Sequence, residues 1–402
     1  MTEGYKNPAL AMLGIKSIKL PSRNWLIFWT VLSGLSGGII YDKWQQRILR
    51  NQYMEKFNNQ NISYPVDHKV RKLKIFIAPP PNDYLDESMK YFRRFVKPII
   101  NSSGLDYELI TMERQGDIRF KVAEEIRQIR RNLIMKDLPE PEIVPEVTNE
   151  ITPITTPNET KSVRDLYNPM DLLGIEKIFG NFKDKKIIND DSIVNDVRNS
   201  GGIICIGRGA YKEYINGIHE GLLGPLDKPE VEKIEKIEEL DKESNTKDTE
   251  DSDDDKYAPS AFIYAKDYSN ATFAPEFGID LNDNIDNIRN KLRDNNGTPY
   301  FFTQPILELR NYNTSGFTKQ FERMWRFYNK RNQLIEYNEN LSKLINCNYC
   351  NFTNDKLNQG IEEENDWPSS WLKTAKINNS EWVREFKGDD RIMKILSSYN
   401  CK

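Results

Sequence analysis

The sequence predicts an α/β protein: one N-terminal transmembrane helix, then a domain built on a parallel sheet, and a second β-rich and helical part at the C-terminus. Three observations lead to this prediction. Residues 25–41 form an apolar run long enough to cross a bilayer. Strand and amphipathic-helix patterns alternate between residues 70 and 225. Further short apolar runs and a long helical pattern follow residue 258.

The apolar run 25–41 is the predicted membrane anchor. As an α-helix it would span about 25 Å, slightly less than a hydrocarbon core of about 30 Å, and flanking side chains can cover the difference. We expect a tail at 1–24, the transmembrane helix at 25–41 and a charged helical connector at 42–69. Side chains suited to the membrane–water interface stand near both ends of the anchor: Arg23, Trp25, Trp29, Tyr41 and Trp44.

A secretory signal peptide is the rival interpretation of this segment. Its apolar region is longer than the usual run of about 7–15 residues, and no small-residue cleavage site is evident. Basic residues stand on both sides of the anchor, so charge alone does not predict its orientation.

Small residues in the anchor predict a contact with another membrane helix. Residues four apart lie on one helix face, where small side chains let two backbones approach closely. The pairs are Ser33 with Gly37 and Gly34 with Gly38. Chance is the alternative, since small residues are common in membrane helices.

Alternating elements at 70–225 predict a doubly wound parallel sheet. A triple proline ends the first strand, and Gly104 ends the first helix. The expected strands are 72–78, 105–112 and 201–206, the expected helices are 89–100, 118–133 and 211–222, and 138–160 is an expected loop.

An acidic insertion at 226–257 is predicted to be a solvated, disordered loop, with a partner-binding tract as the alternative. Beyond it, in the predicted subdomain 258–402, we expect strands at 261–264 and 299–302 and a helix at 316–345. An aromatic stripe on that helix is expected in the core, although interspersed basic residues leave a membrane or partner contact open. The stripe is Phe317, Phe321, Trp325 and Tyr328. Three tryptophans, Trp367, Trp371 and Trp382, are expected to dock the C-terminal segment onto the domain, with an interface as the alternative.

Composition limits the chemistry. The net charge of −4 gives no strong case for nucleic acid, and two histidines in 402 residues argue against a multi-histidine metal site. Cys347 and Cys350 form a C-x-x-C, which fits an incidental or structural pair, a redox pair or half of a metal site.

Residues 203–218 resemble the strand–turn–helix of diacylglycerol and related lipid kinases, which carries Gly-Gly-Asp-Gly-Thr. Gly207, Gly209, Glu213 and the trailing Asn216-Gly217 fit that pattern. Ile206, Arg208 and Ala210 replace its first glycine, its aspartate and its threonine. Phosphoryl transfer needs a carboxylate for the metal, and arginine reverses that charge.

The resemblance therefore implies a kinase-like fold with a vestigial loop and no catalytic, cofactor or metal residues. That loop is Ile206, Gly207, Arg208, Gly209 and Ala210. Residual anion binding by Arg208 stays open. A live membrane-anchored lipid kinase, or a nucleotide- or lipid-binding protein, is the alternative.

A more specific resemblance covers most of the chain. The sequence is similar to subunit 54 of the fungal mitochondrial inner-membrane translocase, the large subunit of the carrier translocase. The matching segments are 4–10, 14–15, 18–25, 41–43, 45–46, 304–307, 316–317 and 326–331.

This resemblance implies a non-enzymatic scaffold in the mitochondrial inner membrane, with the N-terminus in the matrix and the domain in the intermembrane space. It implies channel-forming and small membrane subunits and small intermembrane-space chaperones as partners, and a role in assembling an inner-membrane protease. A single-pass protein of the secretory pathway is the remaining alternative, and glycosylation of the chain's N-x-S/T sequons would distinguish it.

Overall fold

The computed structural model describes residues 22–58, 71–137, 201–228, 260–279, 284–294, 298–317, 319–378 and 380–401. Residues 1–21 of the predicted N-terminal tail, the loop at 138–160 and nearly all of the acidic insertion lie outside these residues. The proposed domain boundaries at 226–257 therefore stay a prediction.

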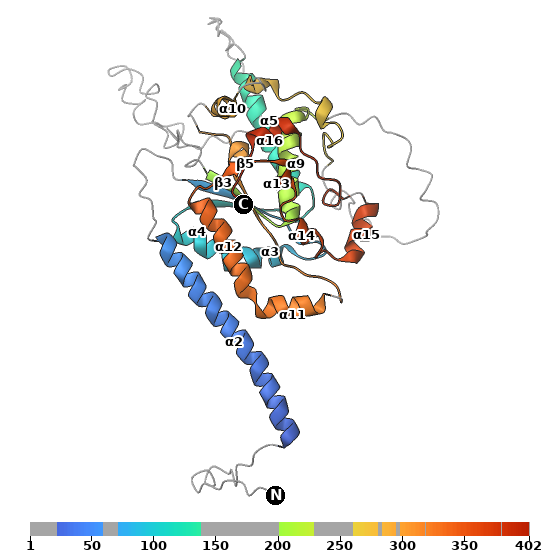
Figure 1. The fold of residues 1–402 in the computed structure, drawn as a ribbon. Coiled ribbons are helices and arrows are strands. Elements are labelled where there is room, and N and C mark those ends of the chain that lie inside the picture. The colour runs from blue at the N-terminus through green and yellow to red at the C-terminus, as the bar shows by residue number, and fades with distance from the viewer. Residues whose placement is uncertain are drawn as a thin grey trace, which may run out of the picture.

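A single six-stranded sheet forms the centre of the domain (Figure 1), in the order β2-β1-β3-β4-β6-β5. Every neighbouring pair is parallel except β5 with β6. The strands are β1 Lys72–Ile77, β2 Asp106–Thr111, β3 Gly201–Ile206, β4 Ile306–Leu309, β5 Cys350–Asn351 and β6 Ser397–Ser398. The predicted α/β class and the first three strands are confirmed.

Helices cover both faces of the sheet. The alternation of side chains along β3 explains this, because Ile203 and Cys205 enter one apolar core while Ile204 and Ile206 enter the other. The first core packs against α5 (Asp117–Asp137) and α9 (Arg208–Leu223). The second packs against α3 (Leu85–Tyr91), the π-helical turn η1 (Phe92–Val96), α4 (Lys97–Ser102) and α12 (Lys330–Ile345).

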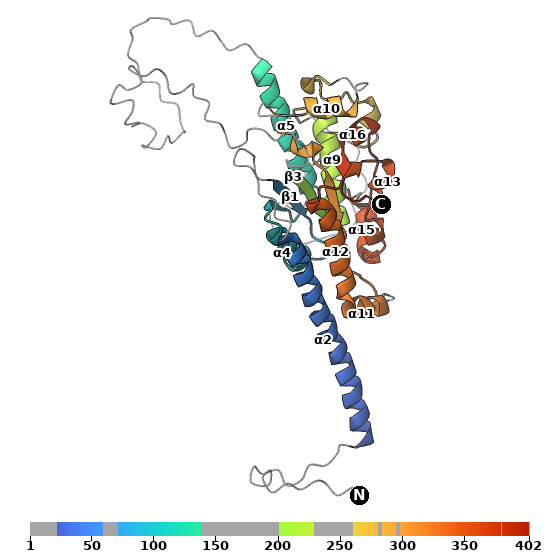
Figure 2. The ribbon, with the colours of Figure 1, turned by 60° about the vertical axis from the view of Figure 1, so that its left-hand side comes forward.

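The predicted anchor and the described part of the predicted connector form one unbroken helix, α2, over Arg23–Asn58. Its apolar half projects alone from one end of the domain (Figures 1 and 2), and it is the one helix among the described residues that is long and apolar enough to cross a membrane. Its second half packs against the second core through Leu49, Tyr53, Met54 and Phe57. The predicted anchor therefore continues directly into the packed domain.

Two predicted strands in the C-terminal part are wrong. Residues 261–264 form bends, and Phe301–Thr303 is a 3-10 turn, η6. Aromatic rings at 299–302 suggested a strand, but Tyr300 and Phe302 stack on each other at 5.6 Å and fill the first core. The strand is the next segment, β4, in which all four residues are buried.

The predicted helix 316–345 is two helices, α11 (Gln320–Tyr328) and α12, separated at Asn329. The side-chain amide of Asn329 donates to the Trp325 carbonyl oxygen at 3.0 Å. Such local bonds compete with continued helix, and the backbone of Asn329 leaves helical geometry with φ −124° and ψ 38°.

The remaining helices and turns are short. They are η4 Tyr268–Asn270, η5 Pro275–Phe277, α10 Ile285–Lys291, α13 Asn354–Leu357, α14 Ile361–Glu364, α15 Ser369–Ile377 and α16 Asp390–Ile395.

Candidate functional site

The loop between β3 and α9 is the site that the sequence singled out. Gly207 has φ +91°, a conformation that suits glycine, and a Cβ there would lie 2.6 Å from the amide nitrogen Nδ2 of Asn311. Ile206 and Ala210 point into the two cores. The glycine therefore serves a tight strand-to-helix turn.

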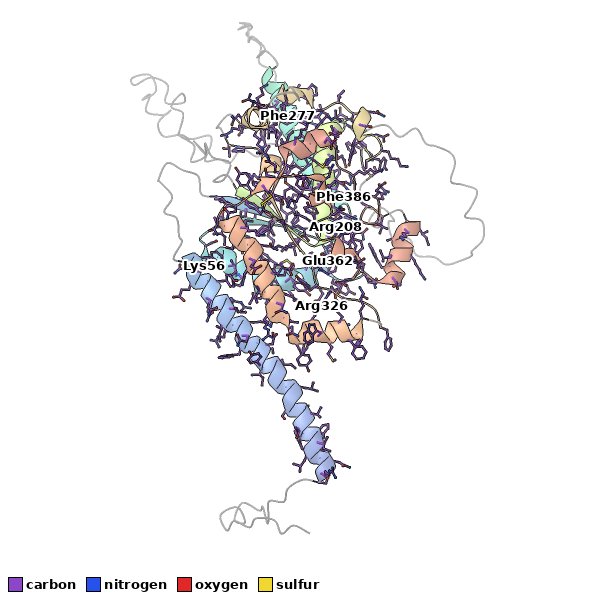
Figure 3. All side chains as sticks on the ribbon, viewed as in Figure 1. Lys56, Arg208, Phe277, Arg326, Glu362 and Phe386 are labelled. Carbon is purple, nitrogen blue, oxygen red and sulfur yellow. A yellow bond between two sulfur atoms is a disulfide. The ribbon has the colours of Figure 1, made fainter. Side chains whose placement is uncertain are left out.

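Arg208 is buried, with 2 % of its surface exposed, in the middle of the domain (Figure 3). Its Nη1 donates to the carbonyl oxygens of Leu357 and Gln359, at 2.6 Å each, and its Nε donates to Glu364 Oε1 at 2.8 Å. Its guanidinium also lies 5.3 Å from the Phe386 ring centroid. These contacts are all with the C-terminal segment, so Arg208 fastens that segment to the turn.

Glu363 of α14 lies at the N-terminus of α9. Its Oε2 accepts hydrogen bonds from the backbone N–H groups of Arg208 (3.0 Å) and Asn311 (2.9 Å). Burial raises the pKa of Glu363 to about 8, although these two donors act to lower it. Backbone N–H groups at a helix N-terminus are the part of such a loop that would bind an anion, and here a carboxyl group of the same chain occupies that position.

Trp382 packs against Gly209 of the β3–α9 loop. A Cβ on Gly209 would lie 2.6 Å from the Trp382 indole, so only glycine leaves room for the ring. Trp382 and Trp367 are buried and Trp371 is half-buried, with ring centroids 5.4–6.2 Å apart. The predicted docking of the three tryptophans onto the domain is confirmed.

Glu213, which fitted the kinase pattern, makes contacts within the domain. Its Oε1 accepts from the backbone N–H of Gly116 (2.8 Å) and from the Trp382 indole (2.5 Å), and its Oε2 accepts from Ile118 N–H (3.1 Å). Burial raises the pKa of Glu213, and the Glu381 carboxylate raises it further. Glu213 therefore holds the start of α5 and the Trp382 segment together.

A cavity of about 560 Å³ lies beside this region, lined in part by Asn216, Glu220, Tyr268 and Glu381. Three of its charged groups pair with one another: Arg119 contacts Glu220 and also donates to Glu381 Oε2 at 2.9 Å. Among the residues the structure describes, no three His, Cys, Asp or Glu side chains are arranged to hold a metal ion.

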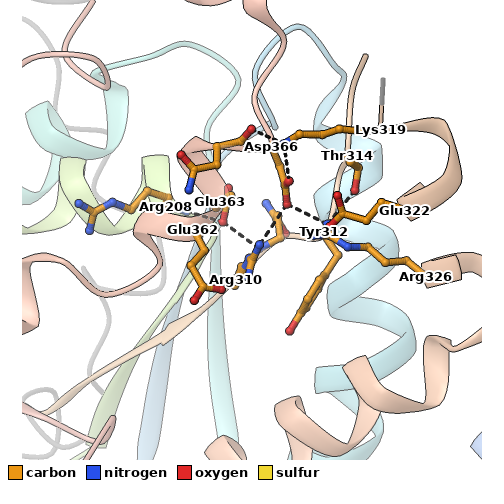
Figure 4. A network of polar contacts seen from close by, with 12 residues as sticks. Arg208, Arg310, Tyr312, Thr314, Lys319, Glu322, Arg326, Glu362, Glu363 and Asp366 are labelled. Atoms are coloured by element: carbon orange, nitrogen blue, oxygen red, sulfur yellow. Dashed lines mark hydrogen bonds and ion pairs between the residues drawn. The ribbon is translucent and has the colours of Figure 1, made fainter. Parts of the chain in front are cut away.

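Sequence reasoning missed a second cluster, which we call the Asp366 clasp: Asp366 with Arg310, Lys319 and Arg326 (Figure 4). Arg326 Nη1 and Arg310 Nη2 reach Asp366 Oδ2 at 2.8 and 3.0 Å, and Lys319 Nζ reaches Oδ1 at 3.0 Å. Burial acts to raise the pKa of Asp366, but the hydrogen bonds and positive charges of Arg326 and Lys319 together lower it. The members are up to 56 residues apart in sequence, so no local pattern marks them.

The aromatic stripe expected in the core is largely on the surface, and that prediction is wrong. The exposed fractions are 92 % for Phe317, 80 % for Phe321 and 69 % for Trp325. Tyr328 is half-buried. The reason is that α11 turns away from α12 at Asn329 and leaves the sheet.

In the anchor, the residues expected at the interface, Trp25, Trp29, Tyr41 and Trp44, are all exposed, as is Arg23. Nothing lies within 4 Å of a Cβ built on Gly34 or Gly37, and the Ser33 hydroxyl donates to the Thr30 carbonyl oxygen of its own helix. Gly38 differs, since a Cβ there would lie 3.3 Å from Cδ1 of Tyr328 on α11. Helix pairing through these residues stays a prediction.

Among the cysteines, the structure joins Cys350 to Cys401, 51 residues away, with a Cα–Cα distance of 5.9 Å. The C-x-x-C pair of the sequence is therefore not the bridged pair. Cys347 accepts a hydrogen bond from Arg71 Nη1 at 3.2 Å.

Fold and site together define a class of protein. It has an α/β domain continuous with a helix that can cross a membrane, and a strand–turn–helix loop whose anion-binding position is filled by a carboxyl group from the same chain. The family described as "Inner membrane protein import complex subunit Tim54" matches residues 7–256 and 237–399. The chain belongs to this family.

Similar proteins cover the chain almost end to end. A mitochondrial import inner membrane translocase subunit TIM54 of Candida albicans is 42 % identical over 99 % of this chain and 97 % of its own length. The TIM54 subunits of Debaryomyces hansenii and Saccharomyces cerevisiae are 37 % and 35 % identical, each over 98 % of this chain and over 91 % and 94 % of their own lengths. The likeness to lipid kinases stays a prediction.

Proposed function

We propose that this protein is a non-enzymatic scaffold subunit of the mitochondrial carrier translocase, supporting insertion of multi-spanning carriers into the inner membrane. Family membership along nearly the whole chain supports a role in the import complex. The observation that carries the non-enzymatic part is Glu363, which occupies the N-terminus of α9 where a phosphate-binding loop would hold its ligand.

In this proposal the N-terminus lies in the matrix, α2 crosses the inner membrane and the α/β domain lies in the intermembrane space. The channel-forming and small membrane subunits would contact the anchor, and the small chaperones would dock on the domain. The exposed face with Gly34 and Gly37 supports the first contact, because it leaves room for a neighbouring helix.

The first test is protease protection in mitochondria that lack their own subunit of this family and carry this chain with a C-terminal tag. Opening only the outer membrane should expose the tag to protease, and insertion of a carrier precursor should recover relative to mitochondria without the chain. A tag protected until the inner membrane is opened would contradict the topology, and unrecovered insertion would contradict the scaffold role.

The second test addresses the lipid-kinase alternative with the full chain in nanodiscs. We expect neither transfer of labelled phosphate from ATP to lipid nor a rise in melting temperature with ATP and magnesium. Phosphate transfer that is lost on Arg208→Ala would overturn the non-enzymatic proposal.

A further inference from the structure

Helix α11 presents an unpartnered apolar face. Phe321, Met324 and Trp325 lie on one side of the helix by their i, i+3, i+4 spacing, with exposed fractions of 80 %, 53 % and 69 %. Phe317, just before the helix, adds a ring that is 92 % exposed. Contiguous exposed rings of this kind mark an interaction site rather than ordinary surface.

The opposite face of α11 is fixed to the domain. Arg326 donates to Asp366 Oδ2 at 2.8 Å and to the Thr314 hydroxyl at 2.7 Å, and it pairs with Glu322 one turn earlier (Figure 4). Lys319, at the start of the helix, holds the other oxygen of Asp366. Because these ion pairs hold the polar face of α11 against the domain, the helix cannot rotate about its axis to bury its aromatic side chains.

Helix α11 lies beside the end of the apolar segment of α2, and this position indicates what its apolar face contacts. Tyr328 packs on Gly38, in the last turn of the apolar segment 25–41. Next along α2, Asp42 accepts a hydrogen bond from the backbone N–H of Arg331 at 3.3 Å. The guanidinium of Arg331 lies 5.7 Å from the Tyr41 ring centroid. Figures 1 and 2 show α11 at the end of the domain from which the apolar half of α2 emerges.

Charge agrees with this position. Apart from Lys319 and Arg326, which pair with Asp366, α11 and the residues just after it carry three further basic residues: Arg323, Lys330 and Arg331. A short helix with aromatic side chains on one face and basic side chains on the other has the character of a segment that lies in the headgroup region of an anionic membrane.

We propose that α11 is a second membrane contact, lying in the bilayer surface beside the anchor with Phe317, Phe321 and Trp325 among the lipid headgroups. The proposal rests on α2 crossing the bilayer, which is part of the proposed function. Together the two helices would hold the domain at a fixed tilt above the membrane.

The test uses the full chain in nanodiscs of phosphatidylcholine and phosphatidylglycerol, with a photoreactive benzoylphenylalanine at one position at a time. Position 325 reports on α11. The matched control is position 135, because Met135 is 68 % exposed and stands near the end of α5 farthest from the anchor (Figure 1). Position 32 in the anchor reports on α2 itself.

After irradiation, intact-mass analysis should show lipid adducts at positions 32 and 325, with a yield at 325 several-fold above that at 135. Adducts at 32 without an excess at 325 would overturn the α11 proposal and leave the anchor in place. Adducts to another copy of the chain at 325 would overturn it in favour of a protein interface. No adduct at 32 would overturn the anchor and the α11 proposal together.

The double substitution Phe321→Ser and Trp325→Ser provides an independent measurement. It removes two of the exposed rings of the apolar face and no buried contact, so the melting temperature should stay close to that of the parent. Amide hydrogen exchange in α11 should become several-fold faster in nanodiscs, while Met135→Ser leaves it unchanged. Unchanged exchange in α11 after the double substitution would contradict lipid contact.

Discussion

At the scale of single residues, His219 shows how burial fixes a protonation state. Its ring is fully buried in α9 and stacks on Tyr268 at 4.9 Å. Nδ1 donates to the Ile215 carbonyl oxygen at 2.7 Å, and Nε2 accepts from the backbone N–H of Asp389 at 2.9 Å. Both nitrogens are satisfied only in the neutral ring, and burial lowers the pKa of His219 to about 4.

This lowered pKa predicts a loss of stability in acid. In the unfolded chain His219 binds a proton near pH 6.5, and in the folded chain only near pH 4. The neutral ring's contribution to the free energy of unfolding is therefore complete above about pH 6.5 and is lost as the pH falls toward 4. It amounts to about 3 kcal/mol at most. Comparing the chain with His219→Leu at pH 7.5 and pH 5 should show a smaller stability difference at pH 5, because other titrating groups cancel between the two proteins.

Histidine NMR gives the direct check on full-length chain in detergent. The His219 ring signals should stay in the neutral form down to pH 5. A midpoint near 6.5 for both of the chain's histidines would contradict the assignment.

At the scale of elements, the pairing of α5 with α9 depends on two glycines one helical turn apart. A Cβ on Gly217 would lie 2.9 Å from Val122 Cβ, and one on Gly221 would lie 2.7 Å from Ile126 Cβ. The absent side chains let the two helices approach closely. The Gly217 that resembled part of a kinase motif thus has a packing explanation in this fold.

Substituting Gly221→Ala should therefore destabilise the protein. Overpacking costs about 1–3 kcal/mol, and the better helix propensity of alanine offsets up to about 1 kcal/mol of that. In an Ile126→Ala background the new methyl gains room, so the cost should shrink, which a double-mutant cycle of chemical unfolding measures.

The matched control is Gly34→Ala in α2, where nothing lies within 4 Å of the new Cβ. It should leave the unfolding of the domain unchanged. Equal effects of Gly221→Ala in both Ile126 backgrounds would show that helix packing is not the cause.

At the scale of the whole molecule, the C-terminal segment of the chain adds a strand to the central sheet. β6 is the next-to-last strand of the sheet and lies beside β4, and the Cys350–Cys401 bridge ties the end of the chain to β5. The Tyr399 hydroxyl accepts from Arg71 Nη2 at 2.8 Å, which connects this end with the start of β1. A hydrogen bond between the residue before β1 and the residue after β6 therefore links the two ends of the domain.

The bridge should stabilise the domain measurably. It closes a loop of about 50 residues, for which the loss of unfolded-chain entropy corresponds to about 2–4 kcal/mol. Cys350→Ser should lower the melting temperature of the full chain, and a reducing agent should lower it similarly in the parent but not in the variant. Peptide mapping without reduction should recover the 350–401 linked peptide, and a 347–350 linkage would contradict this pairing.

The sequence by itself determined the anchor, the parallel strands β1, β2 and β3 and the helices between them, because each produces its own apolar period within a short window. It also marked the β3–α9 turn, since Gly207 and Gly209 stand at the end of a buried strand. These features rest on local physics: periodicity, turn residues and the length of an apolar run.

Only the tertiary structure decided what those features contact. Glu363 at the N-terminus of α9, the Asp366 clasp and the bridge to Cys401 join residues tens to more than a hundred positions apart. The aromatic residues of α11 have the same amphipathic pattern as a core helix, and the pattern alone cannot say whether that face meets a sheet or a membrane. The break at Asn329 and the contact of Tyr328 with Gly38 show that this face does not meet the sheet, because they turn α11 away from the sheet and toward α2.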